Sequence, residues 1–257
     1  MTRPFLPAIL FLSLLTSACR KDKPAAPAQN TGNENVSGDP TMEFKLFANG
    51  SLVVDSTYYT NAAGDSFSIS LFNYYITNIR LTKDDGFVFR ENNSYHLIKH
   101  TEGMESFVIK NVPPGKYRQI EFLIGVDSVT NVTGIKSGAL DPANNMHWDW
   151  NSGYIFFKME GSFTTPKQLF RDDYAIHIGG FKSPNSCLQT VTLPLDSMLI
   201  VSLSKTSRMH VRVSAEEVFK NPYDLGFDYF YSNISDQTFK KVSENYRDMF
   251  TIQNIEN

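Results

Sequence analysis

Short runs of aromatic and β-branched residues, separated by turn residues, recur along this chain from Met42 almost to its end. Residues 75–81 form one such run, and the turn sequence Lys83-Asp84-Asp85-Gly86 separates it from the next. Strands at this spacing, with turns between them, are typical of an antiparallel β-sandwich. The other runs are residues 44–47, 66–71, 87–89, 95–98, 106–109, 118–124, 154–161, 174–178, 188–193, 198–202 and 209–213.

One segment near the C-terminus departs from this pattern. Residues 238–249 carry apolar side chains at spacings of three and four, which predicts a short amphipathic helix with Asp236 as its N-cap. These side chains are Phe239, Val242, Tyr246 and Met249. No sequence repeat and no linker to a second domain interrupts residues 42–257. We therefore expect one all-β domain there, an antiparallel β-sandwich with a short C-terminal helix.

Composition bounds what this domain can bind. The 257-residue chain is 41% hydrophobic and 20% charged, so a packed core is expected. Its formal net charge of −3 provides no basic field for a phosphate backbone, and we expect no nucleic-acid partner. No Gly-x-Ser-x-Gly or phosphate-loop sequence is present, so the chain is not expected to be an enzyme.

The N-terminus predicts export and a lipid anchor. Arg3 precedes an apolar run at residues 5–15, which is too short to span a membrane but suits a signal peptide. Small residues then lead to Cys19, a pattern that favours lipoprotein processing, with residues 1–18 removed and Cys19 acylated. The alternative is plain secretion with cleavage elsewhere, because Leu15 lies one position further from Cys19 than the usual lipobox leucine. Residues 19–41 would form a flexible tether that holds the domain at a bacterial cell-envelope membrane.

Residues 146–154 concentrate the side chains of greatest chemical interest. Both tryptophans lie here, and in an extended segment Trp148 and Trp150 share one face while His147 and Asp149 share the other. Two roles could explain why the bulky tryptophans lie beside these polar residues. They could simply pack in the core, or they could form a metal or redox site. The window alone does not decide between them.

Five segments of the chain match a known family. They are residues 73–81, 122–127, 138–142, 146–154 and 175–180. Together they resemble the MbnP-like domain, which occurs in periplasmic or surface copper-binding proteins and in many lipoproteins of Bacteroidota-type bacteria. The resemblance extends from about Met42 to the C-terminus and implies a β-sandwich. It also implies that a dihaem partner enzyme oxidises a tryptophan to kynurenine, whose aniline nitrogen joins histidines in binding copper.

Four residues carry this implication to the present chain. Trp148 and Trp150 match the family's Met-x-Trp-x-Trp pattern, and His177 matches the histidine of its His-x-Gly segment. His147 lies at a variable position of the block. The chain departs from the family at Trp150, because related copper proteins have a histidine two residues after the modified tryptophan. A metal ligand would then be missing if Trp148 is the modified residue.

The other candidate ligands have more ordinary interpretations. His210 lies in an alternating strand pattern and is expected to be a strand residue, whereas His96 and His100 are expected to be solvated. Cys187 is interpreted as a small buried residue, with soft-ligand chemistry as the alternative. Calcium is a further candidate, because three carboxylates occur in a loop-rich stretch, although no calcium-loop spacing is present. These carboxylates belong to Asp127, Asp141 and Asp149.

The sequence thus predicts a lipid-anchored cell-envelope protein that handles or scavenges copper, by resemblance to MbnP-like proteins. The predicted site residues are His177, Trp148, Trp150 and His147. The alternative is a non-enzymatic surface module that recognises a glycan or a protein through exposed aromatic residues and loops.

The anchor can be tested directly. Cys19→Ala should move the protein from the membrane fraction to the soluble fraction, because the lipid is the only predicted attachment. Fractionation with a high-salt wash provides the measurement. A Cys19→Ala protein that stays in the washed membrane pellet would rule out lipidation of Cys19.

Overall fold

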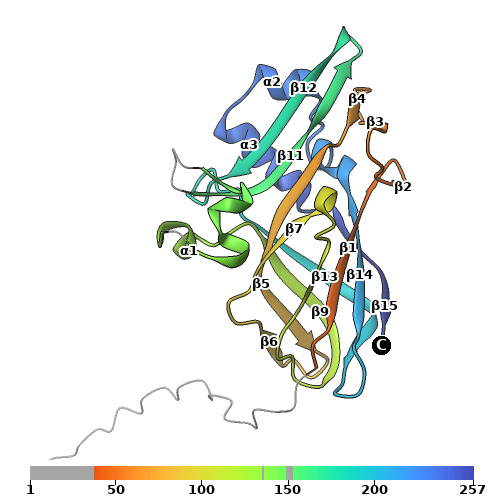
Figure 1. Cartoon of the computed structure of the whole chain (residues 1–257), viewed down its shortest axis with the longest axis vertical. Helices are drawn as coiled ribbons and strands as arrows, with labels where there is room; N and C mark the ends of the chain where they lie inside the picture. The colour runs from red at the N-terminus through yellow and green to blue at the C-terminus, as the bar shows by residue number, and fades with distance from the viewer. Residues whose placement is uncertain (1–37, 135, 149–152) are drawn as a thin grey trace, which may run out of the picture. The chain divides into compact units, whose positions relative to one another are not determined.

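The computed structural model describes residues 38–134, 136–148 and 153–257 (Figure 1). These residues belong to one compact unit, Asn35–Asn257. The predicted signal peptide, Cys19 and most of the tether lie outside the described residues, as do Asp149 and Trp150. No helix in the described ranges is long and apolar enough to cross a membrane.

A ten-stranded sheet dominates the described residues, and strand β11 lies near its centre. Its main path runs β13-β9-β5-β11-β4-β3 (Figure 1). In addition, β10 and β12 pair with β11, and β6 and β7 pair with β5. The strands are β3 (Tyr58–Thr60), β4 (Ser66–Ser68), β5 (Leu71–Lys83), β6 (Val88–Arg90), β7 (Tyr95–Lys99), β9 (Gly115–Ile124), β10 (His147–Trp148), β11 (Gly153–Thr165), β12 (Gln168–Gly179) and β13 (Gln189–Val201).

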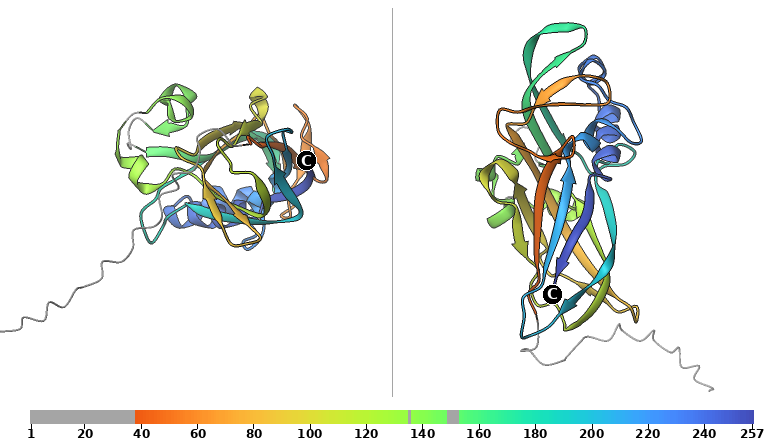
Figure 2. Two further views of the ribbon diagram at one scale, coloured as in Figure 1. Left: turned by 90° about the horizontal axis from the view of Figure 1, so that it is seen from below. Right: turned by 90° about the vertical axis from the view of Figure 1, so that its right-hand side faces the viewer.

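A smaller sheet of five strands lies against part of the larger one (Figure 2). Its order is β15-β14-β1-β2. Strands β2 and β8 pair with the same edge of β1, β2 near the C-terminal end of β1 and β8 near its N-terminal end. The strands are β1 (Thr41–Ala48), β2 (Ser51–Leu52), β8 (Ser106–Val108), β14 (Arg208–Ser214) and β15 (Phe250–Glu256). Strands β1 and β14 pair in parallel, so the sheet is antiparallel except at this one pair among the described residues.

The hydrophobic core lies between the two sheets. Alternate residues of β1 are buried, as expected when one face of a strand contacts a core. Phe44 from β1 lies with its ring 6.2 Å from that of Tyr74 on β5 and 6.1 Å from that of Phe250 on β15. Phe122 on β9 contacts Phe250 from the other side, at 5.2 Å. Face-to-face packing of two mostly antiparallel sheets confirms the predicted all-β sandwich.

Helices are few and short among the residues that the structure describes. They are α1 (Ser128–Val132), α2 (Phe227–Ser232) and α3 (Asp236–Tyr246), with short 3-10 segments at His100–Glu102, Gly138–Leu140, Pro142–Asn144 and Ala215–Phe219. The predicted C-terminal helix is confirmed as α3, but strand β15 follows it. Ser235 caps α3 by accepting a hydrogen bond from the Thr238 backbone nitrogen, and Asp236 is the first helical residue rather than the cap.

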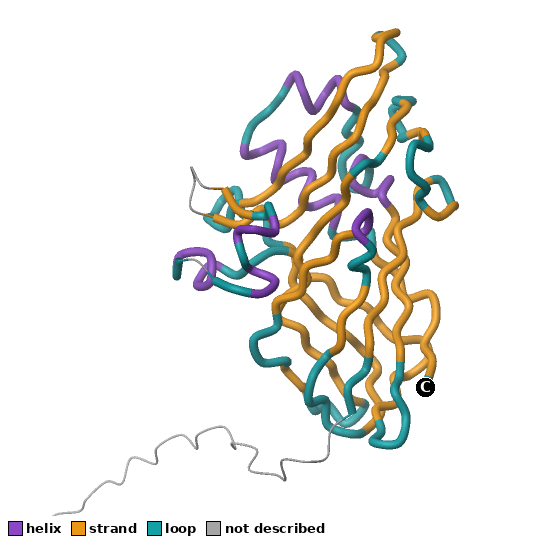
Figure 3. The backbone as a smooth tube through the Cα atoms, in the orientation of Figure 1, coloured by secondary structure: helices purple, strands orange, loops and turns teal. Residues whose placement is uncertain are grey.

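Helices α2 and α3 pack beside the long β11–β12 hairpin (Figures 1 and 3). Phe227 of α2 stacks on Phe163 of β11 with ring centroids 4.3 Å apart. Tyr246 of α3 packs on Phe157 of β11 and donates a hydrogen bond to the Cys187 carbonyl oxygen at 2.6 Å. These contacts fix the position of the hairpin, which carries His177.

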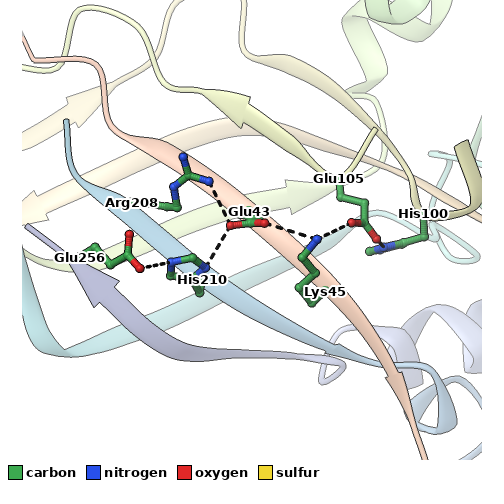
Figure 4. A network of polar contacts seen from close by, with 7 residues as sticks. All are labelled: Glu43, Lys45, His100, Glu105, Arg208, His210 and Glu256. Atoms are coloured by element: carbon green, nitrogen blue, oxygen red, sulfur yellow. Dashed lines mark hydrogen bonds and ion pairs between the residues drawn. The ribbon is translucent and has the colours of Figure 1, made fainter. Parts of the chain in front are cut away.

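A network of charged residues joins strands of the smaller sheet (Figure 4). The Glu43 carboxylate on β1 contacts Arg208, His210 and Lys45 at 3.2, 3.1 and 3.3 Å. His210 also lies 3.1 Å from Glu256, so it links β1 and β14 to β15. Burial raises the pKa of Glu43, but the hydrogen bonds from Arg208 and Lys45 outweigh it and hold that pKa below its usual value.

The prediction that His96 and His100 are solvated is wrong. The His100 side chain is only 2% exposed, and its imidazole contacts Glu105 and the Tyr74 hydroxyl. His96 stacks on Phe107 at 3.8 Å and pairs with Glu91 at 2.8 Å. His96 lies on β7, and His100 begins the 3-10 segment that follows it. Each histidine pairs with a glutamate five residues away along the chain, Glu91 before His96 and Glu105 after His100.

The charge network predicts a loss of stability in acid. Because the pKa of Glu43 is depressed in the folded protein, its ionised form stabilises the fold above the usual pKa of 4.5 and this contribution disappears as pH falls through the lower folded value. Glu43→Gln should therefore reduce the fall in unfolding free energy between about pH 5 and pH 3, measured by urea denaturation.

Glu121→Gln provides a matched control. Glu121 pairs with Arg80 at 2.7 Å on the surface, where such pairs contribute little, so this variant should keep the wild-type pH dependence. Identical pH dependence in Glu43→Gln and wild type would contradict a stabilising role for the network.

Candidate metal-binding pocket

The candidate site begins with a row of polar residues across the larger sheet. Strand pairing aligns Lys99 on β7 with Asn73 on β5, Asn73 with Lys158 on β11, and Lys158 with His177 on β12. Directly paired residues lie on the same face of a sheet. These four side chains therefore share the face opposite the sandwich core, because the neighbouring Tyr74 contacts the core.

Trp148 reaches this face by packing on a glycine. A β-carbon added at Gly179 would lie 2.5 and 2.8 Å from two atoms of the Trp148 ring, closer than real contacts allow. Gly179 is two residues after His177 in β12, and residues at this spacing point to the same side of a strand. The indole thus lies beside His177 only because residue 179 has no side chain.

His147 belongs to the same short strand as Trp148. Strand β10 pairs His147 with Tyr154 and Trp148 with Gly153 of β11. The His147 ring packs against the edge of the Tyr154 ring, with centroids 5.2 Å apart. The structure therefore brings His147, Trp148 and His177, three of the four predicted site residues, to one place. The fourth, Trp150, lies outside the described residues.

These residues line a pocket of about 370 Å³. Strands β5, β10, β11 and β12 contribute to it, together with the loop that precedes β10. Its lining comprises Leu71, Asn73, Glu102, Asn144, Asn145, His147, Trp148, Ile155, Lys158 and His177. The pocket is thus mainly polar, with the tryptophan and two aliphatic residues as its apolar part.

Glu160 orients His177. The imidazole Nε2 lies 2.6 Å from the Glu160 carboxylate, which can accept a hydrogen bond from Nε2–H and leave Nδ1 with its lone pair. Burial lowers the pKa of His177, and although Glu160 raises it, the nearby Lys158 ammonium adds to the lowering. His177 is therefore neutral at pH 7, the state in which an imidazole binds a metal ion.

Asn73 has a buried oxygen without a partner. The residue is 3% exposed, and its side-chain Oδ1 accepts no hydrogen bond from any residue that the structure describes. Its two neighbours in the row bind other acceptors. Lys99 Nζ lies 3.0 Å from Glu102, whereas Lys158 Nζ lies 3.4 Å from Glu160 and donates to the Asn145 carbonyl oxygen.

The sequence analysis did not identify Asn131, whose hydrogen bonds hold helix α1 against strand β11 next to this site. Asn131 accepts a hydrogen bond from the Tyr154 backbone nitrogen through Oδ1 and donates to the Val126 carbonyl oxygen through Nδ2. It thereby ties α1 to β11 beside β10. Its position near the start of a long loop gave no signal of this role, because the partner strand follows more than twenty residues later.

The remaining ligand candidates lie elsewhere or are already engaged. His210 belongs to the charge network of the smaller sheet. Cys187 is buried, as expected, and burial raises the pKa of its thiol to about 12, which disfavours the thiolate that binds metals. Asp127 and Asp141 cap short helices by accepting hydrogen bonds from backbone nitrogens, so these carboxylates give calcium no support.

A larger groove adjoins the pocket. Its volume is about 700 Å³, and it shares Trp148 and His177 with the smaller pocket. One wall comes from β11 and β12 and the other from α2, α3 and the segment between them. Apolar side chains dominate this second wall, namely Phe230, Tyr231, Ile234 and Phe239.

Comparison with known proteins gives the family. The sequence profile of the family described as MbnP matches residues 37–238. The chain belongs to the MbnP family. The resemblance inferred from the sequence motifs is therefore confirmed. A search of curated protein sequences finds no match. One solved structure, MbnP from Methylosinus trichosporium, matches with 14% identity over 74% of this chain and 80% of that chain, at a TM-score of 0.48.

The pocket contains a small set of side chains whose types can bind a metal ion. The described residues contain no group of three or more histidine, cysteine, aspartate or glutamate side chains that could hold a metal ion. Two imidazoles nevertheless line one pocket, next to the indole that the family resemblance implicates and to the unpartnered oxygen of Asn73. Imidazole suits copper, and mixed nitrogen and oxygen donors are typical of Cu(II) sites.

Proposed function

We propose that this protein binds a copper ion in the pocket formed by His147, Trp148 and His177. The observation that carries the proposal is the contact of Trp148 with Gly179, which sets the indole beside an oriented, neutral histidine. Membership of the MbnP family supports copper over other metals that imidazole also binds. Copper would occupy the outer face of the larger sheet, away from the sandwich core.

Each residue has a distinct role in this proposal. His177 would hold copper through Nδ1, while Glu160 accepts its Nε2–H and keeps the ring in orientation. His147 would supply a second nitrogen in the same pocket. Trp148 limits access of water from one side, and oxidation to kynurenine would convert it into a further nitrogen ligand. This step requires the dihaem enzyme that the family resemblance implies as a partner.

The cellular role follows from the predicted anchor. A lipid on Cys19 and the tether that follows would hold the domain at the membrane of the bacterial cell envelope, in the periplasm or at the surface. There the protein would handle or scavenge copper rather than catalyse a reaction. The Lys158–Glu160 pair keeps the pocket close to neutral, so bound copper faces no uncompensated ammonium.

A second candidate function is recognition of an organic ligand or a protein partner. The observation that favours it is the apolar groove between β12 and α3, which is large enough for a small molecule. The two candidates differ in their dependence on metal, because a groove ligand would bind equally well to protein stripped with a chelator.

Substitution of His177 tests the copper proposal. Removing a residue that only hydrogen-bonds a metal ligand typically lowers metal affinity by up to about 100-fold. His177→Ala removes a proposed ligand itself, so it should lower copper affinity by more than about 100-fold. Glu160→Gln should lower it by about 10-fold to 100-fold. Copper content of protein purified from its own host, and titration of chelator-treated protein, provide the measurements.

Stability and a distant histidine provide the controls. His177 is 30% exposed and its ion pair is near the surface, so His177→Ala should change the melting temperature of the metal-free protein little. His210→Ala removes an imidazole from the other sheet and should leave copper binding unchanged. Equal copper binding by wild type and His177→Ala, or none by wild type, would refute the proposal.

A further inference from the structure

The buried side-chain oxygen of Asn73 lacks a hydrogen bond from any residue that the structure describes, which lowers the stability of the fold, and the fold alone does not explain it. A buried polar atom without a hydrogen bond destabilises a protein, and native structures rarely contain one without a reason. Asn73 Oδ1 is such an atom among the described residues, and it belongs to a side chain that lines the pocket. A group from outside the chain, bound in the pocket, would satisfy it.

The surrounding residues do not satisfy this oxygen. The two lysines that flank Asn73 in the row each contact a glutamate. Lys99 contacts Glu102 in the 3-10 segment after β7, and Lys158 contacts Glu160 on the same strand. Both ammonium groups are therefore neutralised and directed elsewhere. The oxygen of Asn73 is left without a hydrogen-bond donor among the described residues, buried in the wall of a pocket whose lysine charges are balanced.

The position of Asn73 matches that of a metal ligand. Asn73 and His177 lie two strands apart in the same row, which separates their Cα atoms by roughly 9.5 Å. Both side chains extend from the same face into one pocket. An ion about 2 Å from each donor atom can bridge such side chains. Lys158 lies between them, with its ammonium held by Glu160 and the Asn145 carbonyl oxygen.

We propose that Asn73 binds the copper ion directly through Oδ1 and that this oxygen favours Cu(II) over Cu(I). The inference rests on the copper site proposed above. Nitrogen and oxygen donors suit Cu(II), whereas Cu(I) prefers soft sulfur donors, so loss of an oxygen ligand penalises the oxidised ion selectively. Asn73 would replace, in part, the histidine that is absent at Trp150.

Asn73→Leu tests the assignment because it removes the oxygen and keeps the side-chain size similar. We expect Cu(II) affinity to fall about tenfold or more while Cu(I) affinity changes little. A tenfold selective loss raises the Cu(II)/Cu(I) reduction potential by about 59 mV. Competition titrations of each oxidation state, and voltammetry of the loaded protein, measure these quantities.

The stability of the metal-free protein provides a second readout. Asn73→Leu should leave the melting temperature of the metal-free protein unchanged or raise it, because an unsatisfied polar atom is removed. Asn245→Leu is the matched control outside the pocket. Asn245 donates hydrogen bonds to the Val218 and Tyr223 carbonyl oxygens, so its loss should lower stability without changing the preference between Cu(II) and Cu(I).

Asn73→Asp keeps an oxygen at the same position and adds negative charge, so it should bind Cu(II) at least as tightly as wild type. If Asn73→Leu fails to fold, a Cu(II) affinity of Asn73→Asp below that of wild type would overturn the role of Asn73. Unchanged Cu(II) affinity in Asn73→Leu, with His177→Ala defective, would overturn the role of Asn73 and leave the copper site standing. Absence of copper binding by wild type would overturn both.

Discussion

The register of strand β11 between β5 and β12 is the constraint from which the proposed site follows. Because Lys158 pairs with Asn73 on one side and with His177 on the other, residues far apart in the chain form one row on one face. A shift of one residue would turn His177 toward the core and Ile176 or Ile178 toward the pocket. Apolar residues on the inner face of β11 and β12 oppose that shift, so core packing fixes the position of the polar row.

Glycine at position 179 completes the arrangement. The indole of Trp148 occupies the space where any side chain would lie, and Tyr154 contributes its backbone oxygen at 2.6 Å from the same point. A substitution at Gly179 would therefore displace the tryptophan, the backbone of β11 or both. The His-x-Gly segment thus contains both a candidate metal ligand, His177, and the glycine that leaves space for the Trp148 ring, Gly179.

Carboxylate pairing does not by itself distinguish a metal-binding histidine in this protein. His96, His100, His177 and His210 each contact at least one glutamate. His100 is buried against aromatic rings, and His210 has carboxylates at both ring nitrogens, so neither presents an open nitrogen to a cavity. His177 differs because it shares a pocket with Trp148, His147 and the unpartnered oxygen of Asn73.

Sequence patterns predicted the fold well because strand periodicity and turn residues are local properties. The run at residues 75–81 became part of β5, and the segment at 238–249 became most of α3. The two runs at 188–193 and 198–202 merged into one irregular strand, β13, because a bulge near Pro194 joins them.

The site was predictable only in part. Sequence motifs singled out Trp148, His147 and His177, which the structure brings together. Asn73 and Glu160 could not be found in this way, because their roles depend on strand register and on an unmet hydrogen bond. The solvated interpretation of His100 failed for the same reason, since its burial comes from Phe72 and Tyr74 on a neighbouring strand.

Anomalous X-ray diffraction at the copper edge, from crystals of protein purified from its own host, would locate the metal ion. We expect one strong copper peak within bonding distance, about 2 Å, of a His177 nitrogen and beside the Trp148 ring. A copper peak at the His210 network instead, or no peak in protein saturated with copper, would contradict the proposed copper site.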